Sequence, residues 1–241
     1  MTNRTALVTG ASARVGRAIA LELAESGFDV AIHYRSSSER AREVADACKR
    51  AGSDAWIVQA NLEDPQQIDE MVAAVLARWP RLDVLVNNAS IFEPLAFEDI
   101  DVEAWDRMAA INLRAPFLIS RGLLGALRAA EGLVVHMCDI GADRPVAGYA
   151  HYSASKAGLV MLVKAMAVEL APVRALGISP GQVAWPEDYP AEKRARLARR
   201  IPLGRAGEPS DIARLVRFAA LEGPYLNGEI IAVDGGLSKR Y

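Results

Sequence analysis

Short apolar runs alternate with amphipathic stretches along almost all of the 241 residues, and this alternation constrains the fold more than any other feature. An uninterrupted apolar run is typical of a strand covered on both faces, as in parallel sheets flanked by helices. We expect strands near 5–9, 30–34, 55–60, 84–86, 133–137, 175–179 and 229–233. Between them we expect helices near 15–26, 39–51, 65–78, 101–130, 153–170 and 210–220. The sequence thus predicts one α/β domain over residues 1–241, a doubly wound parallel sheet of seven strands with helices on both faces.

Charge, cysteines and apolar run lengths narrow the class of protein. A formal net charge of −2 gives no reason to expect nucleic acid or an anionic membrane as partner. Cys48 and Cys138 lack metal-ligand spacing, and no apolar run approaches the ~20 residues of a membrane helix. We therefore expect a cytoplasmic protein without a metal.

The irregular segment 182–202 is the expected substrate-binding lid, because ligands bind beyond the carboxyl ends of such strands.

The stretch TGASARVGRAI, residues 9–19, joins the first expected strand to the first helix. Gly10 permits a tight turn, and Gly16 lets helix and strand approach closely. The amides at the start of that helix, around Val15, would then face a pyrophosphate. Arg14 stands where such loops usually have a middle glycine, and its guanidinium could pair with phosphate oxygens or reach a substrate. This placement predicts a dinucleotide site.

The second strand ends in HYRSS, residues 33–37. A cofactor with a free ribose hydroxyl would favour an acid at this point, whereas Arg35 with Ser36 and Ser37 suits a 2′-phosphate. With His33 and Tyr34 beside them, these residues predict NADPH as the cofactor. The alternative is a solvated loop that happens to carry one arginine.

Tyr152 and Lys156 stand four residues apart in an expected helix and so share one face. The Lys156 ammonium is expected to lower the pKa of Tyr152 from about 10, which would make the phenol a proton donor. Without other signals, such a pair is an ordinary pair of surface neighbours. Asn112 precedes Pro116 by four residues, and because proline has no N–H, the Asn112 carbonyl is free to hold a water in a proton relay. The alternative is a simple helix kink.

Together these motifs resemble the short-chain dehydrogenase/reductase family along essentially the whole chain. The matching features, in the family's order, are TGxxxxxG at 9–16, NNA at 87–89, Asn112, the Tyr152–Lys156 pair, Pro180–Gly181 and VDGG at 233–236. The resemblance implies a Rossmann fold, NADPH-dependent hydride transfer and a homotetramer. It implies that Tyr152 is the acid, Lys156 its activator and ribose anchor, and Asn112 the water holder. The other cofactor contacts implied by the match are Asn61, Leu62, Asn88, Ala89, Ser90, Pro180 and Gly181.

An acid, Asp139, stands thirteen residues before Tyr152, where the family usually has a serine. Reduction of a ketone makes an alkoxide, and a carboxylate ~4 Å away would oppose its charge by roughly 4 kcal/mol at an effective dielectric near 20. That corresponds to about three powers of ten in rate. Reduction of a C=N bond makes the nitrogen basic, so a nearby acid helps. Asp139 therefore predicts a nitrogen heterocycle as substrate.

Arg14, Ser90 after the NNA motif, Phe92 and Asp139 together resemble the pteridine reductase branch of the family, which includes bacterial dihydromonapterin reductases. The resemblance implies NADPH-dependent reduction of dihydropterins, and in some members folates, to the tetrahydro level. Phe92 would sandwich the pterin against the nicotinamide, Arg14 and Ser90 would bind its polar edges, and Asp139 and Tyr152 would share proton delivery.

Phe92 and Asp139 each have a simpler alternative role. Phe92 could be a core aromatic, and Asp139 could be a surface turn residue. The protein could instead be a general ketoreductase acting on an acyl or sugar carbonyl. It could also be a non-catalytic dinucleotide sensor or scaffold, although that role would not need Asn112, Tyr152 and Lys156 together.

Overall fold

A single parallel sheet of seven strands forms the centre of the computed structural model, which describes residues 3–183 and 190–240, apart from the Lys193 side chain. The strands are β1 (Arg4–Val8), β2 (Phe28–Tyr34), β3 (Trp56–Gln59), β4 (Val84–Asn87), β5 (Leu133–Met137), β6 (Arg174–Pro180) and β7 (Ile230–Val233). Their spatial order is β3-β2-β1-β4-β5-β6-β7. The order reverses direction between β1 and β4, and ligands bind at such a point in open α/β sheets.

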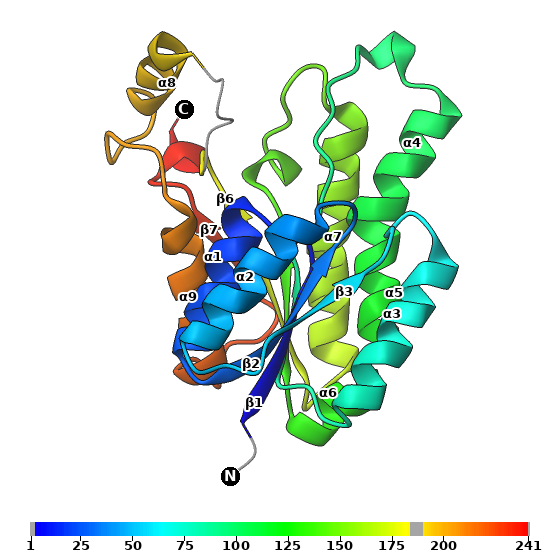
Figure 1. The fold of residues 1–241 in the computed structure, drawn as a ribbon. Coiled ribbons are helices and arrows are strands. Elements are labelled where there is room, and N and C mark those ends of the chain that lie inside the picture. Colours follow the sequence, from blue (N-terminus) through cyan, green and yellow to red (C-terminus); the bar gives the residue numbers. More distant parts are fainter. Residues whose placement is uncertain (1–2, 184–189, 241) are drawn as a thin grey trace.

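Helices cover both faces of the sheet (Figure 1). Those on one face are α1 (Arg14–Glu25), α2 (Ser38–Arg50) and α9 (Pro209–Leu221). Those on the other are α3 (Pro65–Arg78), α4 (Val102–Ala109), α5 (Ala115–Gly122), α6 (Leu124–Ala130) and α7 (Ala150–Glu169). The predicted doubly wound α/β fold is confirmed, because the sheet is parallel throughout and covered on both sides.

Alternate residues of each central strand enter two separate cores, which explains why these strands read as unbroken apolar runs. Ala6 and Val8 of β1 pack with α1, α2 and α9, whereas Leu7 between them packs with α3, α5 and α6. In α1, Ile19 and Leu23 are fully buried at the spacing of one helix face. Each such side chain contributes roughly 1.5–3 kcal/mol to stability.

Two regions differ from the sequence-based expectation. The single helix expected over 101–130 begins as predicted, with Asp101 Oδ1 accepting from Ala104 N at 2.8 Å. It is then interrupted by a π-helical turn, η2 (Ala110–Arg114), and divides again between α5 and α6. The segment expected to be irregular, 182–202, contains a helix, α8 (Ala191–Ala198), while 184–189 lie outside the described residues.

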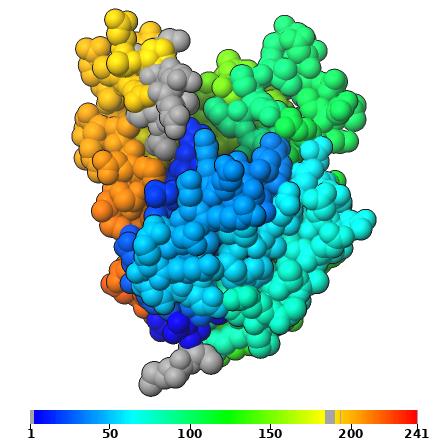
Figure 2. Space-filling model, in the orientation of Figure 1, coloured from blue at the N-terminus to red at the C-terminus, as the bar shows by residue number. Residues whose placement is uncertain are grey.

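The carboxyl ends of the strands open onto a notch in the molecular surface. In the space-filling view the notch separates the yellow segment that carries α8 from the green segment around α4 (Figure 2). Within the described part of the chain, the helices are too short or too polar to cross a lipid bilayer.

Candidate functional site

The loop between β1 and α1 leaves room for a ligand because two of its positions have no side chain. Gly10 has a positive φ of 62°, and a Cβ there would lie 3.0 Å from the Ala89 Cα. A Cβ on Gly16 would collide with the Gly10 carbonyl oxygen. No side chain caps the start of α1 among the described residues, so its first amides stay available. Such a helix start suits a pyrophosphate.

His33 supports this loop through contacts of both ring nitrogens with backbone atoms. Its Nδ1 accepts a hydrogen bond from Gly10 N at 3.0 Å, and its Nε2 lies 3.1 Å from the Ala60 carbonyl oxygen. With these partners, Nδ1 is the acceptor and Nε2 the donor, as in a neutral ring. Burial lowers the pKa of His33 from 6.5 to about 4, so the ring stays neutral at physiological pH.

A cavity of about 230 Å³ lies beside this loop at the ends of β1 to β4. Nine of the predicted cofactor residues lie on its wall: Gly10, His33, Tyr34, Arg35, Ser36, Asn61, Leu62, Ala89 and Ser90. Ser37, expected beside Ser36 at a 2′-phosphate, lies on the wall as well, and three wall residues were not anticipated: Ser12, Ile91 and Ile111. Ser12 lies in the loop that the sequence singled out, whereas Ile111 gave no signal of its own. Arg35 is exposed and free of ion pairs in the described structure, which fits a role in binding a 2′-phosphate.

The remaining predicted cofactor residues lie off this wall. Asn88 donates through Nδ2 to the carbonyl oxygens of Thr9 at 2.8 Å and Gly10 at 3.2 Å, and thereby ties β4 to the loop. Val15 packs against the core, and Arg14 is exposed with an unusual positive φ of 50°. Their predicted contacts with the cofactor stay predictions.

Pro180 and Gly181 end β6 and lie off the same wall. Gly181 N donates to the Val233 carbonyl oxygen at 3.0 Å, and a Cβ on Gly181 would collide with Asp234. The Pro-Gly turn therefore lets the ends of β6 and β7 approach closely. Its predicted contact with the cofactor also stays a prediction.

Asp139 and Tyr152 meet at the carboxyl end of β5. Tyr152 Oη donates to Asp139 Oδ2 at 2.8 Å, and the other carboxylate oxygen accepts from Gly141 N at 2.6 Å. Asp139 thereby begins the short helix η3 (Ile140–Ala142), and its side chain faces the phenol. The alternative that Asp139 is only a surface turn residue is therefore wrong: its second oxygen engages the predicted acid directly.

Lys156 behaves differently from the sequence-based expectation. Its Nζ donates to the Met137 carbonyl oxygen at 2.7 Å and lies 5.7 Å from the centre of the Tyr152 ring. Burial lowers the pKa of Lys156, while burial and the Asp139 carboxylate raise the pKa of Tyr152. The predicted lowering of the Tyr152 pKa by Lys156 is therefore wrong in this structure, because the carboxylate stabilises the protonated phenol and the ammonium points to the backbone.

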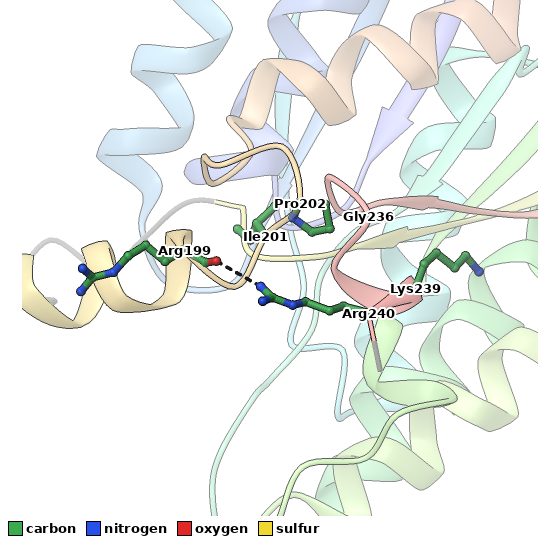
Figure 3. A pocket seen from close by; sticks show the side chains of 6 residues that line it. All are labelled: Arg199, Ile201, Pro202, Gly236, Lys239 and Arg240. Atoms are coloured by element: carbon green, nitrogen blue, oxygen red, sulfur yellow. Dashed lines mark hydrogen bonds between the residues drawn. The ribbon is translucent and has the colours of Figure 1, made fainter.

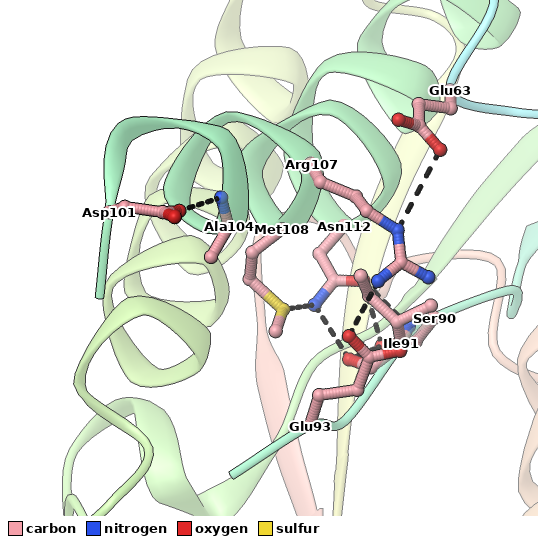
Figure 4. Close-up of polar contacts among 9 residues, drawn as sticks. All are labelled: Glu63, Ser90, Ile91, Glu93, Asp101, Ala104, Arg107, Met108 and Asn112. Carbon is pink, nitrogen blue, oxygen red and sulfur yellow. Dashed lines mark hydrogen bonds and ion pairs between the residues drawn. The ribbon is translucent and has the colours of Figure 1, made fainter. Parts of the chain in front are cut away.

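Asn112 lies in the π-helical turn and joins α4 to the loop after β4 (Figure 4). Its Oδ1 accepts from Ser90 Oγ at 3.0 Å and Ile91 N at 2.9 Å, and its Nδ2 donates to Ile91 O at 3.0 Å and Ser155 Oγ at 3.2 Å. The Ser155 hydroxyl in turn donates to the Tyr152 carbonyl oxygen at 2.7 Å. The side chain of Asn112 therefore positions the site, while the predicted role of its carbonyl as a water holder stays a prediction.

Phe92 presents an aromatic face beside the Asp139–Tyr152 pair. Its ring stacks on Tyr149, with centroids 4.2 Å apart and 10° between planes, and meets the Tyr152 ring edge-on at 4.7 Å. Because 60% of Phe92 is exposed, the alternative that it is a core aromatic is wrong. The stacking partner, Tyr149, was not anticipated from the sequence.

The chain is similar in sequence and in fold to known reductases. A family model described as enoyl-(acyl carrier protein) reductase matches residues 10–238. The 3-oxoacyl-[acyl-carrier-protein] reductase FabG of Staphylococcus aureus is 35% identical, covering 97% of this chain and 98% of that protein. The trihydroxynaphthalene reductase PfmaI of Pestalotiopsis fici is 32% identical, covering 96% and 88%.

A solved structure of a short-chain dehydrogenase/reductase from Serratia marcescens, a double mutant, superposes with a TM-score of 0.90 at 32% identity over 98% of both chains. The relatives' names favour the ketoreductase alternative over the pteridine branch. The prediction that the cofactor is NADPH is confirmed. On the matches of sequence and structure, the chain belongs to the short-chain dehydrogenase/reductase family.

Proposed function

We propose that this short-chain reductase uses NADPH to reduce the C=N bond of a dihydropterin, with dihydrofolate as a second candidate substrate. The observation that carries the proposal is the 2.8 Å hydrogen bond from Tyr152 Oη to Asp139 Oδ2. It places a carboxylate against the group that would donate the proton. A developing alkoxide would be repelled there, whereas a ring nitrogen that gains a proton would be stabilised.

Side chains of this protein would supply the proton that the reduced ring nitrogen takes up. When bound, NADPH supplies the hydride. The Tyr152 phenol keeps its proton at neutral pH, because burial and Asp139 raise its pKa, and it releases that proton only to a base such as the reduced nitrogen. Asp139 can then accept a hydrogen bond from a ring N–H or amino group. The Lys156 ammonium nearby offsets part of the negative charge on the pair.

The aromatic surface beside the pair suits a flat ring. Phe92 and Tyr149 lie nearly parallel, and the exposed part of Phe92 offers one more stacking face. Ser90 stands at the same loop, with its hydroxyl held by Asn112. A pterin bound against Phe92 would bring its polar edge towards Ser90, Asp139 and Tyr152.

The second candidate is a ketoreductase acting on a 3-oxoacyl thioester, and the name of the Staphylococcus aureus relative favours it. The names of the two relatives concern unlike substrates, an acyl chain and a fused aromatic ring, although each chain is about a third identical to this one. Substrate choice thus varies within this range of identity. A ketoreductase would need Asp139 either protonated or turned away during the reaction.

A direct assay decides between the candidates. The protein is mixed with NADPH and dihydrobiopterin, dihydrofolate or acetoacetyl thioester, and the loss of reduced-nicotinamide absorbance is followed. Oxidation that depends on the pterin supports the proposal, and oxidation that depends only on the thioester overturns it. NADPH binding without turnover of any of the three would favour the non-catalytic alternative.

Replacement of the acid gives a sharper test. We expect Asp139→Ser to lower pterin reduction well over tenfold and to leave NADPH binding nearly intact. The matched control is Asp143→Ser, which removes a carboxylate from the same loop. An unchanged rate in the Asp139 variant would contradict the proposed role.

The homotetramer implied by the family is a further part of the proposal, and sedimentation of the purified protein measures it.

A further inference from the structure

The last residues of the described chain contact the end of α8 (Ala191–Ala198). Arg240 follows the short helix η4 (Leu237–Lys239), and its guanidinium Nη1 donates to the carbonyl oxygens of Arg199 at 3.1 Å and Arg200 at 3.2 Å. These carbonyls come directly after α8. Figure 3 shows the Arg240 side chain reaching across to the end of that helix. A cation suits this position, because the carboxyl end of a helix carries partial negative charge.

The same residue is held from the side of the reaction centre. Arg144 Nη1 donates to the Arg240 backbone oxygen at 2.7 Å. Arg144 stands five residues after Asp139, and its amide donates to the Ile140 carbonyl oxygen at 3.1 Å. A continuous set of hydrogen bonds therefore runs from the Asp139 loop through Arg240 to α8.

The base of this connection is fixed to the sheet. Asp234, which follows β7, accepts from Gly236 N at 2.9 Å and from Ser238 N at 2.6 Å. These bonds set the turn from which Arg240 projects. A cavity of about 540 Å³ lies at this junction, and its lining residues are Arg199, Ile201, Pro202, Gly236, Lys239 and Arg240.

The described side chains of α8 bury little of their surface. Every residue of α8 whose side chain is described is exposed or only partly buried. The helix therefore lacks the apolar face that fixes α1 or α9 on the sheet, and hydrogen bonds at its end carry more of its placement. Bonds made by a charged donor are about twice as strong as neutral ones.

We propose that Arg240 is a positioning residue that holds α8 at a fixed distance from the Asp139 loop and so shapes the substrate side of the site. The proposal rests on the proposed function only in placing the substrate beside Asp139, and not on which substrate is reduced. Arg240 acts through backbone carbonyls and touches no reacting atom. Its removal should loosen the attachment of α8 and leave the chemistry of Tyr152 intact.

The kinetic test compares Arg240→Met with Lys239→Met. Both variants lose one positive charge from the same turn, but the Lys239 side chain makes no hydrogen bond in the described structure and acts on Asp234 only through a longer-range charge interaction. We expect Arg240→Met to raise the substrate KM about tenfold, with kcat within about twofold and NADPH affinity unchanged. Lys239→Met should behave as the parent protein. Equal KM values in the two variants would overturn the proposal.

Limited digestion with trypsin tests the same idea without any substrate. If Arg240 holds α8, the bonds after Arg196, Arg199 and Arg200 should be cut several-fold faster in Arg240→Met than in the parent protein or Lys239→Met. Arg144→Met should act in the same direction, and the double variant with Arg240→Met should add little. Unchanged cleavage in Arg240→Met, or equal acceleration in Lys239→Met, would overturn the proposal. This readout holds even if neither the pterins nor the thioester are reduced.

Discussion

The two halves of the site are built in different ways. On the cofactor side, around β1 to β3, His33 is buried and bonded at both ring nitrogens, and Gly16 leaves no space for a side chain. On the substrate side, Phe92 is mostly exposed and α8 is held by Arg240 through backbone carbonyls. The first half is fixed by packing and backbone geometry, and the second by a few surface contacts. Changes of substrate are therefore expected to involve the second half, and relatives about a third identical to this chain do have names that refer to unlike substrates.

The largest effect should come from removing the Tyr152 hydroxyl. We expect Tyr152→Phe to lower turnover by about 10²–10⁴-fold, because the reduced atom loses its proton donor. NADPH affinity, measured by fluorescence titration, should change less than about twofold, because the aromatic ring stays in place and only the hydroxyl is lost. The matched control is Tyr149→Phe, which keeps the ring that stacks on Phe92. Equal losses of turnover and cofactor affinity in Tyr152→Phe would break the comparison between the halves.

Acid should destabilise the fold through two buried histidines. Burial lowers the pKa of His33 to about 4 and of His136 to about 3, from 6.5. Below pH 6.5 the unfolded chain takes up these protons first, so stability present at higher pH is lost as the pH falls towards the folded-state values. For His33 the interval corresponds to roughly 3 kcal/mol.

Urea unfolding between neutral pH and pH 4 measures this loss. The variant His33→Gln removes the titrating group from the cofactor side, so its stability should fall less steeply with pH than that of the parent protein. The remaining slope would include His136, which lies on β5 beneath the substrate side. Identical slopes in the two proteins would contradict the assignment of His33 as a buried neutral ring.

A side chain at Gly16 should lower the affinity for the cofactor and leave the substrate side unchanged. A Cβ at this position would collide with the Gly10 carbonyl oxygen, and such overpacking costs about 1–3 kcal/mol. We expect Gly16→Ala to lower NADPH affinity roughly ten- to hundredfold. Gly125→Ala is the control, because a Cβ there meets no atom within 4 Å. NADPH affinities that match in the two variants would show that the loop adjusts freely.

The smallest effect should concern the choice between the two nicotinamide cofactors. Arg35 lies on the wall of the cofactor cavity, and its loss should remove a charge-assisted contact with a 2′-phosphate. We expect Arg35→Gln to reduce the preference for NADPH over NADH about tenfold, measured as a ratio of kcat/KM values. Arg40→Gln, an exposed change on α2, should leave the ratio unchanged. A constant ratio in both variants would mean that another residue reads the phosphate.

The strands were predictable to within about two residues, because their apolar runs are uninterrupted and bounded by turns. The helix over 101–130 was wrong in its continuity, although Pro116 marked where the regular hydrogen bonds had to change. Helix α8 has helix-forming residues, AEKRARLA, but no apolar face, so its sequence gives no sign of what the helix packs against. Its placement depends on Arg240, more than forty residues away, and no local pattern shows such a bond.

In the candidate site, too, features set by the fold could be predicted, whereas individual side-chain partners could not. Asp139 and Tyr152 could be predicted to meet, because a strand end and a helix start come together at one edge of the sheet. The direction of the Lys156 ammonium could not, because four-residue spacing gives the helix face but not the partner that the side chain selects. Tyr149 gave no signal as the stacking partner of Phe92, since that contact joins two loops.

The backbone at Arg14, the first residue of α1, adopts a conformation that lowers the stability of the fold. Its φ of 50° lies in the left-handed region, where a residue other than glycine costs about 1–2 kcal/mol. Engineering for heat resistance would therefore select Arg14→Gly early, and screening by melting temperature alone would favour it. Such a selection would discard the guanidinium at the start of α1, so a more durable protein would come at the expense of whatever Arg14 binds.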